Sequence, residues 1–180
     1  MTELLADMAL ESEAATLLAM DLATHFGSTT ALDTAWRRVM TPVAKFWNCK
    51  RAVGLTGEAM EVFGGNGYVE TGPMGRLFRE APVNSIWEGS GNVMALDVLR
   101  ALSRTPEALE AFFAELDLAA GADARLDTFV DGLRGEFADT EAIEHRARRV
   151  VEDMAKALQG SLMVRHAPPA VADAFCAARL

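Results

Sequence analysis

The residues whose types and spacing could do chemistry lie between residues 61 and 92, in a segment rich in glycine. Its first part is a turn that reads Gly64-Gly65-Asn66-Gly67. Glycines permit positive φ angles and carry no Cβ, so the backbone N–H groups of such a turn can lie against a phosphate or a planar ring. The turn is therefore a candidate binding site for an anionic cofactor. The alternative is a helix C-cap followed by an ordinary turn.

The second part of the segment places an isolated carboxylate, Glu88, after Ile86-Trp87 and before a glycine. A carboxylate that is partly desolvated beside an aromatic ring can act as a general base. Ser90 and Asn92 follow, and their side chains could bind a phosphate or a cofactor edge at a helix N-terminus. The alternatives are that Glu88 complements the dipole of the next helix and that Ser90 and Asn92 cap it.

Helices must position this segment, because no stretch of the chain alternates as a strand does. Apolar residues at helical spacing predict helices over residues 2–26, 31–63, 90–103, 105–119, 123–137, 141–165 and 170–178, with a short helical turn at 74–79. Pro42 is expected to kink the second helix or to mark a new start. The predicted fold class is all-α, with an antiparallel helical bundle over residues 1–103 and a smaller helical extension over 104–180.

Composition narrows the class of protein. Seventeen Lys and Arg against 26 Asp and Glu give a net charge of −9 over 180 residues, which disfavours nucleic-acid binding. The two cysteines form no CxxC, and the three histidines have no metal-ligand spacing, so no metal site is predicted. No uncharged run reaches the length of a membrane span. We therefore expect a cytoplasmic protein with no membrane partner.

Three motifs resemble the C-terminal helical domain of FAD-dependent acyl-CoA dehydrogenases. They read EVFGGNGY over 61–68, RLFREA over 76–81 and IWEGSGN over 86–92. Family members carry segments like QxFGGxGY, RLMRDA and IYEGTxQI, and the spacing between the three matches without a gap. The stretches over 5–16, 41–51, 79–100 and 166–176 resemble the DNA-alkylation-response branch of that family, the AidB-like proteins. The resemblance thus spans essentially the whole chain.

The resemblance implies a role for each matching residue. Glu88 matches the catalytic base, which takes the α-proton of an acyl-CoA thioester while the β-hydride leaves to FAD. Gly65, with Gly64 beside it, matches a backbone contact to FAD in the neighbouring subunit. Ser90 and Asn92 stand where the family has Thr and Gln touching FAD.

Three residues depart from the family pattern. Glu61 replaces a Gln near the adenine end of FAD, where an acid repels phosphate. Asn92 is one methylene shorter than Gln, and Trp87 replaces a Tyr beside the acyl pocket. These changes argue against ordinary fatty acyl-CoA turnover but leave the base in place.

The resemblance also implies parts that the sequence lacks. The family's subunit places an N-terminal helical domain and a central β-domain before this helical domain, and nothing here predicts a β-domain. We therefore expect the chain to be the C-terminal portion of a longer flavin-dependent oxidoreductase. By itself it should bind FAD weakly or not at all and be inactive. The alternative is a non-catalytic helical module for dimerisation or for a DNA-damage response.

The expected partners are an acyl-CoA-like substrate and further copies of the chain, because apolar faces of helices 2–26 and 31–63 would otherwise be exposed. DNA is a weaker candidate, through Arg146, Arg148 and Arg149. Residues 122–180 hold eight Lys and Arg against ten Asp and Glu. The spacings Glu144–Arg148 and Glu152–Lys156 suit pairs within a helix. A solvated face of ion pairs is the better interpretation.

Overall fold

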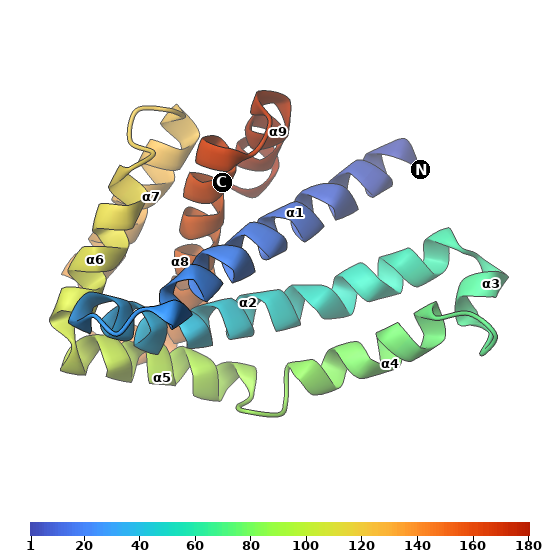
Figure 1. Cartoon of the computed structure of the whole chain (residues 1–180), viewed down its shortest axis with the longest axis horizontal. Helices are drawn as coiled ribbons and strands as arrows, with labels where there is room; N and C mark the ends of the chain where they lie inside the picture. The colour runs from blue at the N-terminus through green and yellow to red at the C-terminus, as the bar shows by residue number, and fades with distance from the viewer.

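The computed structural model describes all 180 residues as nine α-helices and one 3-10 helix, with no β-strand. The predicted all-α fold class is confirmed, and Figure 1 shows the arrangement. In chain order the elements are α1 (Thr2–Thr24), η1 (His25–Gly27), α2 (Ala31–Val62), α3 (Gly65–Tyr68), α4 (Met74–Asn84), α5 (Gly91–Arg104), α6 (Pro106–Asp117), α7 (Ala124–Ala138), α8 (Ile143–His166) and α9 (Pro169–Arg179).

The long helix α2 is the element around which the others pack. It has 32 residues; α1 lies along one side of it, α4 and α5 follow it along another, and α8 crosses it (Figure 1). No new helix starts at Pro42, because α2 runs through this residue without a break. A proline removes one backbone hydrogen bond from a helix, but Met40, Pro42 and Val43 are all buried. Their burial offsets the lost bond.

One hydrophobic core of 29 buried residues spans both predicted parts of the chain. It joins the N-terminal half of α2 to α5, α6, α7 and α8. Members of the helical pattern predicted for residues 31–63 lie at its centre: Trp36, Val39, Val43 and Phe46. Since α5 and α2 share this core, α5 is held against α2 along its middle and C-terminal part.

The segment between α2 and α5 is more helical than predicted. The turn expected at 74–79 is a helix of eleven residues, α4, which continues through Pro82 to Asn84. Gly75 and Ala81 of α4 are buried, and the helix packs along α2. Tertiary packing here outweighs the local cost of a proline in the last turn.

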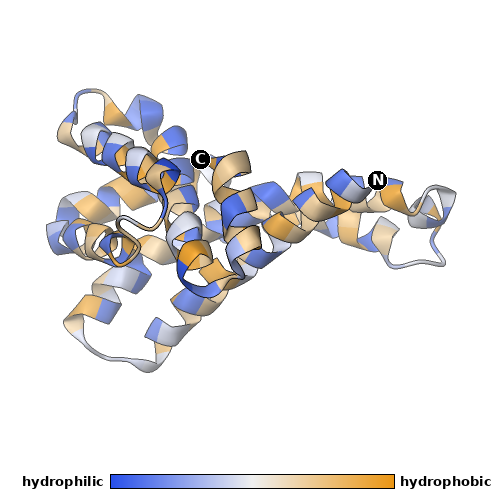
Figure 2. Cartoon of the chain, turned by 90° about the horizontal axis from the view of Figure 1, so that it is seen from above, coloured by the Kyte–Doolittle hydropathy of each residue, from blue (hydrophilic) through white to orange (hydrophobic).

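The second half of α2 projects from the core as an arm. No residue of α2 after Trp47 is buried. Figure 2 shows this end of α2, with α3, α4 and the start of α1, reaching away from the remaining helices. Phe63 and Tyr68, which flank the glycine turn, are 60% and 77% exposed. None of the helices combines the length and apolar composition needed to cross a membrane.

Candidate functional site

The predicted base, Glu88, lies in the turn between α4 and α5. Its φ angle is 59°, and the following Gly89 has a φ of 120°. A left-handed conformation is uncommon for residues other than glycine, and such residues gather at tight turns and functional sites. The Lys45 ammonium of α2 donates a hydrogen bond to the Gly89 carbonyl oxygen. A side chain from the rigid core thus holds the turn that carries Glu88.

Glu88 is exposed, so the partial desolvation predicted from its apolar neighbours is not found in this chain. Ile86 and Trp87 are themselves 63% and 59% exposed. They do not bury the carboxylate, because the turn lies on the surface and no other element covers it. Glu88 also precedes the N-cap position of α5, and the first turn of that helix contains no acid. Glu88 therefore lies just outside the first turn of α5.

Ser90 occupies the N-cap position of α5, but its hydroxyl makes no capping hydrogen bond. The first N–H groups of a helix have no partner within the helix and carry a partial positive charge. Capping by Ser90 and an acid in the first turn would both offset this charge, and α5 has neither. The N-terminus of α5 is left free to bind an anion.

Cationic side chains surround this helix end. A Cβ added to Gly91 would lie 2.7 Å from Cε and 3.5 Å from Nζ of Lys50, so this ammonium approaches the first residue of α5. Lys45 contacts the preceding Gly89, and Arg148 of α8 contacts the next residue, Asn92. Cations near a helix N-terminus repel its dipole. The cations and the helix end together favour a nearby anion.

The Arg148 guanidinium donates a 2.8 Å hydrogen bond from Nη1 to Oδ1 of Asn92. Its Cζ also lies 5.6 Å from the ring centroid of Phe46. The Glu144–Arg148 pair predicted from spacing does not form, because this tertiary contact takes the guanidinium. The predicted pair between Glu152 and Lys156 does form, at 2.5 Å.

The three glycines of the turn at 64–67 have different structural roles. Gly64 has a φ of 57° and ends α2, as the C-cap alternative requires. A Cβ on Gly67 would lie 2.1 Å from the Met60 carbonyl oxygen, so this glycine is needed for packing. Gly65 has open space within 4 Å and no unusual φ angle. The fold gives no reason for a glycine at 65, which leaves its backbone open to a ligand.

The two halves of the predicted site lie apart. Gly64 and Gly65 are at one end of α4, and Glu88, Ser90 and Asn92 are at the other (Figure 1). The eleven residues of α4 span about 16 Å. The chain brings Glu88, Ser90 and Asn92 together but does not bring the glycine turn to them.

A hollow of about 510 Å³ lies next to the glycine turn, between α2 and α4. Met60, Tyr68 and Phe78 supply its apolar surface. Arg79 and Glu70 supply its polar surface. Arg79 donates hydrogen bonds of 2.8 and 3.0 Å to the Glu70 carboxylate. The hollow gives the glycine turn an apolar neighbour.

Two of the arginines named as candidates for DNA binding, Arg146 and Arg149, form ion pairs within the fold. Arg146 lies 3.5 Å from Glu136 and 3.3 Å from Asp139, and Arg149 lies 2.8 Å from Glu136. Their charges are offset by acids of α7 and of the loop that follows it. No group of three or more His, Cys, Asp or Glu side chains is placed to hold a metal ion.

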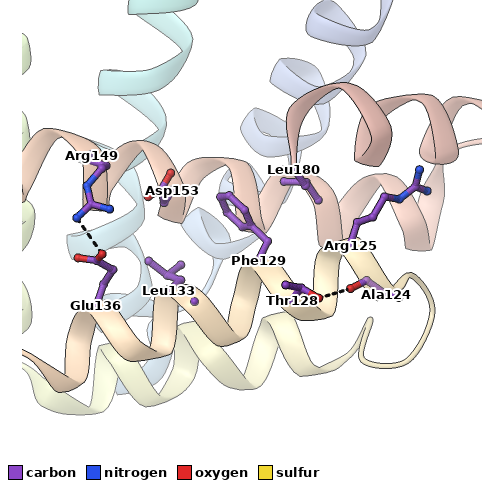
Figure 3. Close-up of a pocket in the computed structure, with 10 residues that line it drawn as sticks. Ala124, Arg125, Thr128, Phe129, Leu133, Glu136, Arg149, Asp153 and Leu180 are labelled. Carbon is purple, nitrogen blue, oxygen red and sulfur yellow. Dashed lines mark hydrogen bonds and ion pairs between the residues drawn. The ribbon is translucent and has the colours of Figure 1, made fainter.

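A separate cavity of about 680 Å³ lies between α7 and α8, beside the C-terminal Leu180 (Figure 3). Phe129 and Leu133 line its wall, and the ion pair of Arg149 and Glu136 closes one end. None of the predicted site residues lines it. The residues able to do chemistry therefore do not coincide with this cavity.

Fold and site together define an all-α domain with an exposed carboxylate beside a positively charged helix N-terminus. The model of the family described as the acyl-CoA dehydrogenase C-terminal domain matches residues 1–103. The chain therefore belongs to this family.

Known relatives extend the match over the whole chain. AidB of Escherichia coli (strain K12) is 38% identical over 177 residues, which are 98% of this chain and 32% of AidB. Acyl-CoA dehydrogenase family member 11 of Caenorhabditis elegans is 42% identical over 105 residues, covering 58% of this chain and 16% of that protein. The crystal structure of Caenorhabditis elegans ACDH-11 in complex with C11-CoA superposes with a TM-score of 0.88 at 27% identity. It covers 97% of this chain and 35% of that one. The chain thus spans about a third of the length of AidB and of ACDH-11.

Proposed function

We propose that this chain supplies the base-bearing and part of the flavin-contacting surface of a flavin-dependent acyl-CoA dehydrogenase-type oxidoreductase. One observation carries the proposal: Glu88 stands in a left-handed turn beside a helix end that has cations around it, no acid in its first turn and no side-chain cap. Such an end favours an anion. A carboxylate and an anionic cofactor side by side are what α-proton abstraction coupled to flavin chemistry needs.

The residues present fit FAD as that anion. Ser90 has a hydroxyl free of capping, and Asn92 has an amide nitrogen with no partner in the protein. Both can donate to oxygens of the cofactor. Gly65 can offer its backbone, because no side chain crowds it. Glu61, exposed at the end of α2, fits poorly with a phosphate and keeps that group away from its carboxylate.

When bound, FAD supplies the acceptor for the hydride that leaves the β-carbon of the thioester. The chain's own part is Glu88, whose carboxylate accepts the α-proton. A base works best when water is excluded from it, and nothing in this chain covers Glu88. We therefore infer that the covering surface comes from elsewhere, and that the 180-residue chain by itself holds FAD weakly and does not turn over.

The separation of Gly65 from Glu88 suits a homo-oligomer in which each chain contributes to two flavins. Large apolar side chains of the predicted faces are exposed: Leu5 at 46%, Met20 at 60%, Phe26 at 61%, Leu32 at 59% and Phe63 at 60%. Apolar surface of this extent seeks a partner. We also propose that the bundle typical of the family ends at residue 103, as a boundary in sequence only, because both parts share one core. The cytoplasm as the protein's compartment is part of the same proposal.

A comparison of two proteins tests the proposal. One is the 180-residue chain, and the other is a chimera in which residues 1–180 replace the segment of AidB that they match. We expect the chimera to retain FAD through gel filtration and the isolated chain to lose it. A yellow isolated chain with one FAD per chain would contradict the inferred division of the flavin site. A chimera that folds, by its circular dichroism, yet binds no FAD would contradict the flavin role itself.

A further inference from the structure

We propose that Arg148, in the C-terminal extension, is a positioning residue that fixes Asn92 as a hydrogen-bond donor toward the cofactor. The inference rests on the proposed function, because it concerns the same ligand-facing surface. It assigns a purpose to the extension, which lies beyond the residues that the family model matches.

The argument starts from the chemistry of the two groups. A guanidinium only donates hydrogen bonds, whereas a carboxamide has one accepting and one donating end. Arg148 Nη1 lies 2.8 Å from the Asn92 side chain, so the amide oxygen must face the arginine. The amide nitrogen then points away, and it has no acceptor within the protein. Arg148 thereby decides that Asn92 offers donors, and not an acceptor, to whatever lies beside α5.

Arg148 is itself held in place. Its guanidinium lies over the ring of Phe46, a core residue only 4% exposed, at 5.6 Å from the centroid. Its helix, α8, packs against α5 and α2, and the neighbouring Val150 and Val151 are fully buried. A stacked, planar cation keeps its orientation better than a flexible ammonium does. The donor geometry at Asn92 is therefore set by the core of the extension.

A simpler role for Arg148 would be to add positive charge near an anionic ligand. The two roles make different predictions for lysine. Arg148→Lys keeps the charge but loses the planar fork that stacks on Phe46. A role through charge alone survives that substitution, and a role through the orientation of Asn92 does not.

The experiment measures the dissociation constant for FAD in the chimera described above. We expect Arg148→Met to weaken FAD binding about tenfold, the size of a lost hydrogen bond to a charged group. Arg148→Lys should weaken FAD binding by nearly the same factor. Arg104→Met, which removes an exposed arginine with no partner in the fold, is the matched control for charge and should change the affinity less than twofold.

A double-mutant cycle with Asn92→Ala separates positioning from general damage. If Arg148 acts through Asn92, Arg148→Met should have almost no further effect on FAD affinity once Asn92 is alanine. The thermal unfolding midpoint should stay within about 2 °C throughout, because Arg148 is exposed.

Each remaining outcome decides against the inference. Equal FAD affinity in Arg148→Met and the unmutated chimera, unchanged FAD affinity in Arg148→Lys, or additive effects in the cycle would each overturn it while leaving the proposed function intact. Loss of FAD from the unmutated chimera would instead overturn the proposed function. The two failures are therefore distinguishable.

Discussion

Trp47 on α2 and Gln159 on α8 are joined by a buried hydrogen bond of 3.0 Å from the indole Nε1 to Oε1 of the amide. The two residues are 7% and 2% exposed. Trp47 belongs to the part of the chain that matches the family, and Gln159 belongs to the extension. Because one core runs through both parts, we expect the chain to unfold in a single transition.

The effects of removing the two partners of this bond should not be additive. Gln159→Leu leaves the buried indole N–H unpaired and should lower the free energy of unfolding by about 1–3 kcal/mol. Trp47→Phe leaves the Gln159 amide unpaired and adds a loss of volume. The double variant should lose less than the sum of the two, measured by urea unfolding. Strict additivity would show that the bond contributes nothing.

Two glycines of the same turn should differ in how strongly alanine destabilises the fold. Gly67→Ala places a Cβ 2.1 Å from the Met60 carbonyl oxygen, so backbone must shift, and a loss of about 1–3 kcal/mol is expected. Gly65→Ala meets no atom within 4 Å and should change stability by less than about 0.5 kcal/mol. Unfolding midpoints compare the two. In the chimera, Gly65→Ala should nevertheless weaken FAD binding, and unchanged FAD affinity would remove Gly65 from the flavin surface.

Acid should destabilise the start of α2. Hydrogen bonds from Ser28, Thr30 and His25 hold the pKa of Asp33 well below its usual range. The folded state thus binds this proton less readily than the unfolded state, whose pKa is about 3.9. The contribution of Asp33 is therefore complete above that pH and is lost as pH falls through the folded pKa. Asp33→Asn should lower the free energy of unfolding at pH 7, and this free energy should then fall less steeply below about pH 4 than it does in the unmodified chain. The control is Asp131→Asn, at an exposed position, which should show the same dependence on pH as the unmodified chain.

Duplex DNA should not be retained by this chain, even at low salt. Arg146 and Arg149 are paired with Glu136 and Asp139, and the chain carries a net charge of −9. Phosphate contacts need free cations. A gel-shift titration at about 50 mM salt, near the low end of the usual salt range, checks this. Retention that weakens steeply with added salt would reopen the DNA hypothesis.

Helical periodicity was sufficient to predict the fold class and most helix positions, because each helix buries one regular apolar face. It was not sufficient where packing overrules local sequence, as at Pro42 and Pro82, which stand inside helices. The motifs drew attention to Glu88, but its exposure depends on what else covers the turn. The bond from Arg148 to Asn92 joins residues 56 positions apart. Spacing along one helix instead predicted Glu144 as the partner of Arg148.

The role of Glu88 is the central claim, and one measurement tests it most directly. In the FAD-loaded chimera, Glu88→Gln is compared with Glu144→Gln, an exposed glutamate with no ion pair. Both variants are mixed anaerobically with a panel of acyl-CoA thioesters that includes C11-CoA. Loss of flavin absorbance and exchange of the α-proton with D₂O are followed for each.

We expect Glu88→Gln to retain FAD but to lose both flavin reduction and α-proton exchange by at least about a hundredfold, the usual contribution of a general base. Glu144→Gln should behave as the unmutated chimera does. Flavin reduction by Glu88→Gln at the unmutated rate would contradict the assignment of Glu88 as the base. No reduction of the unmutated chimera by any thioester would contradict the proposed oxidation of acyl-CoA thioesters itself.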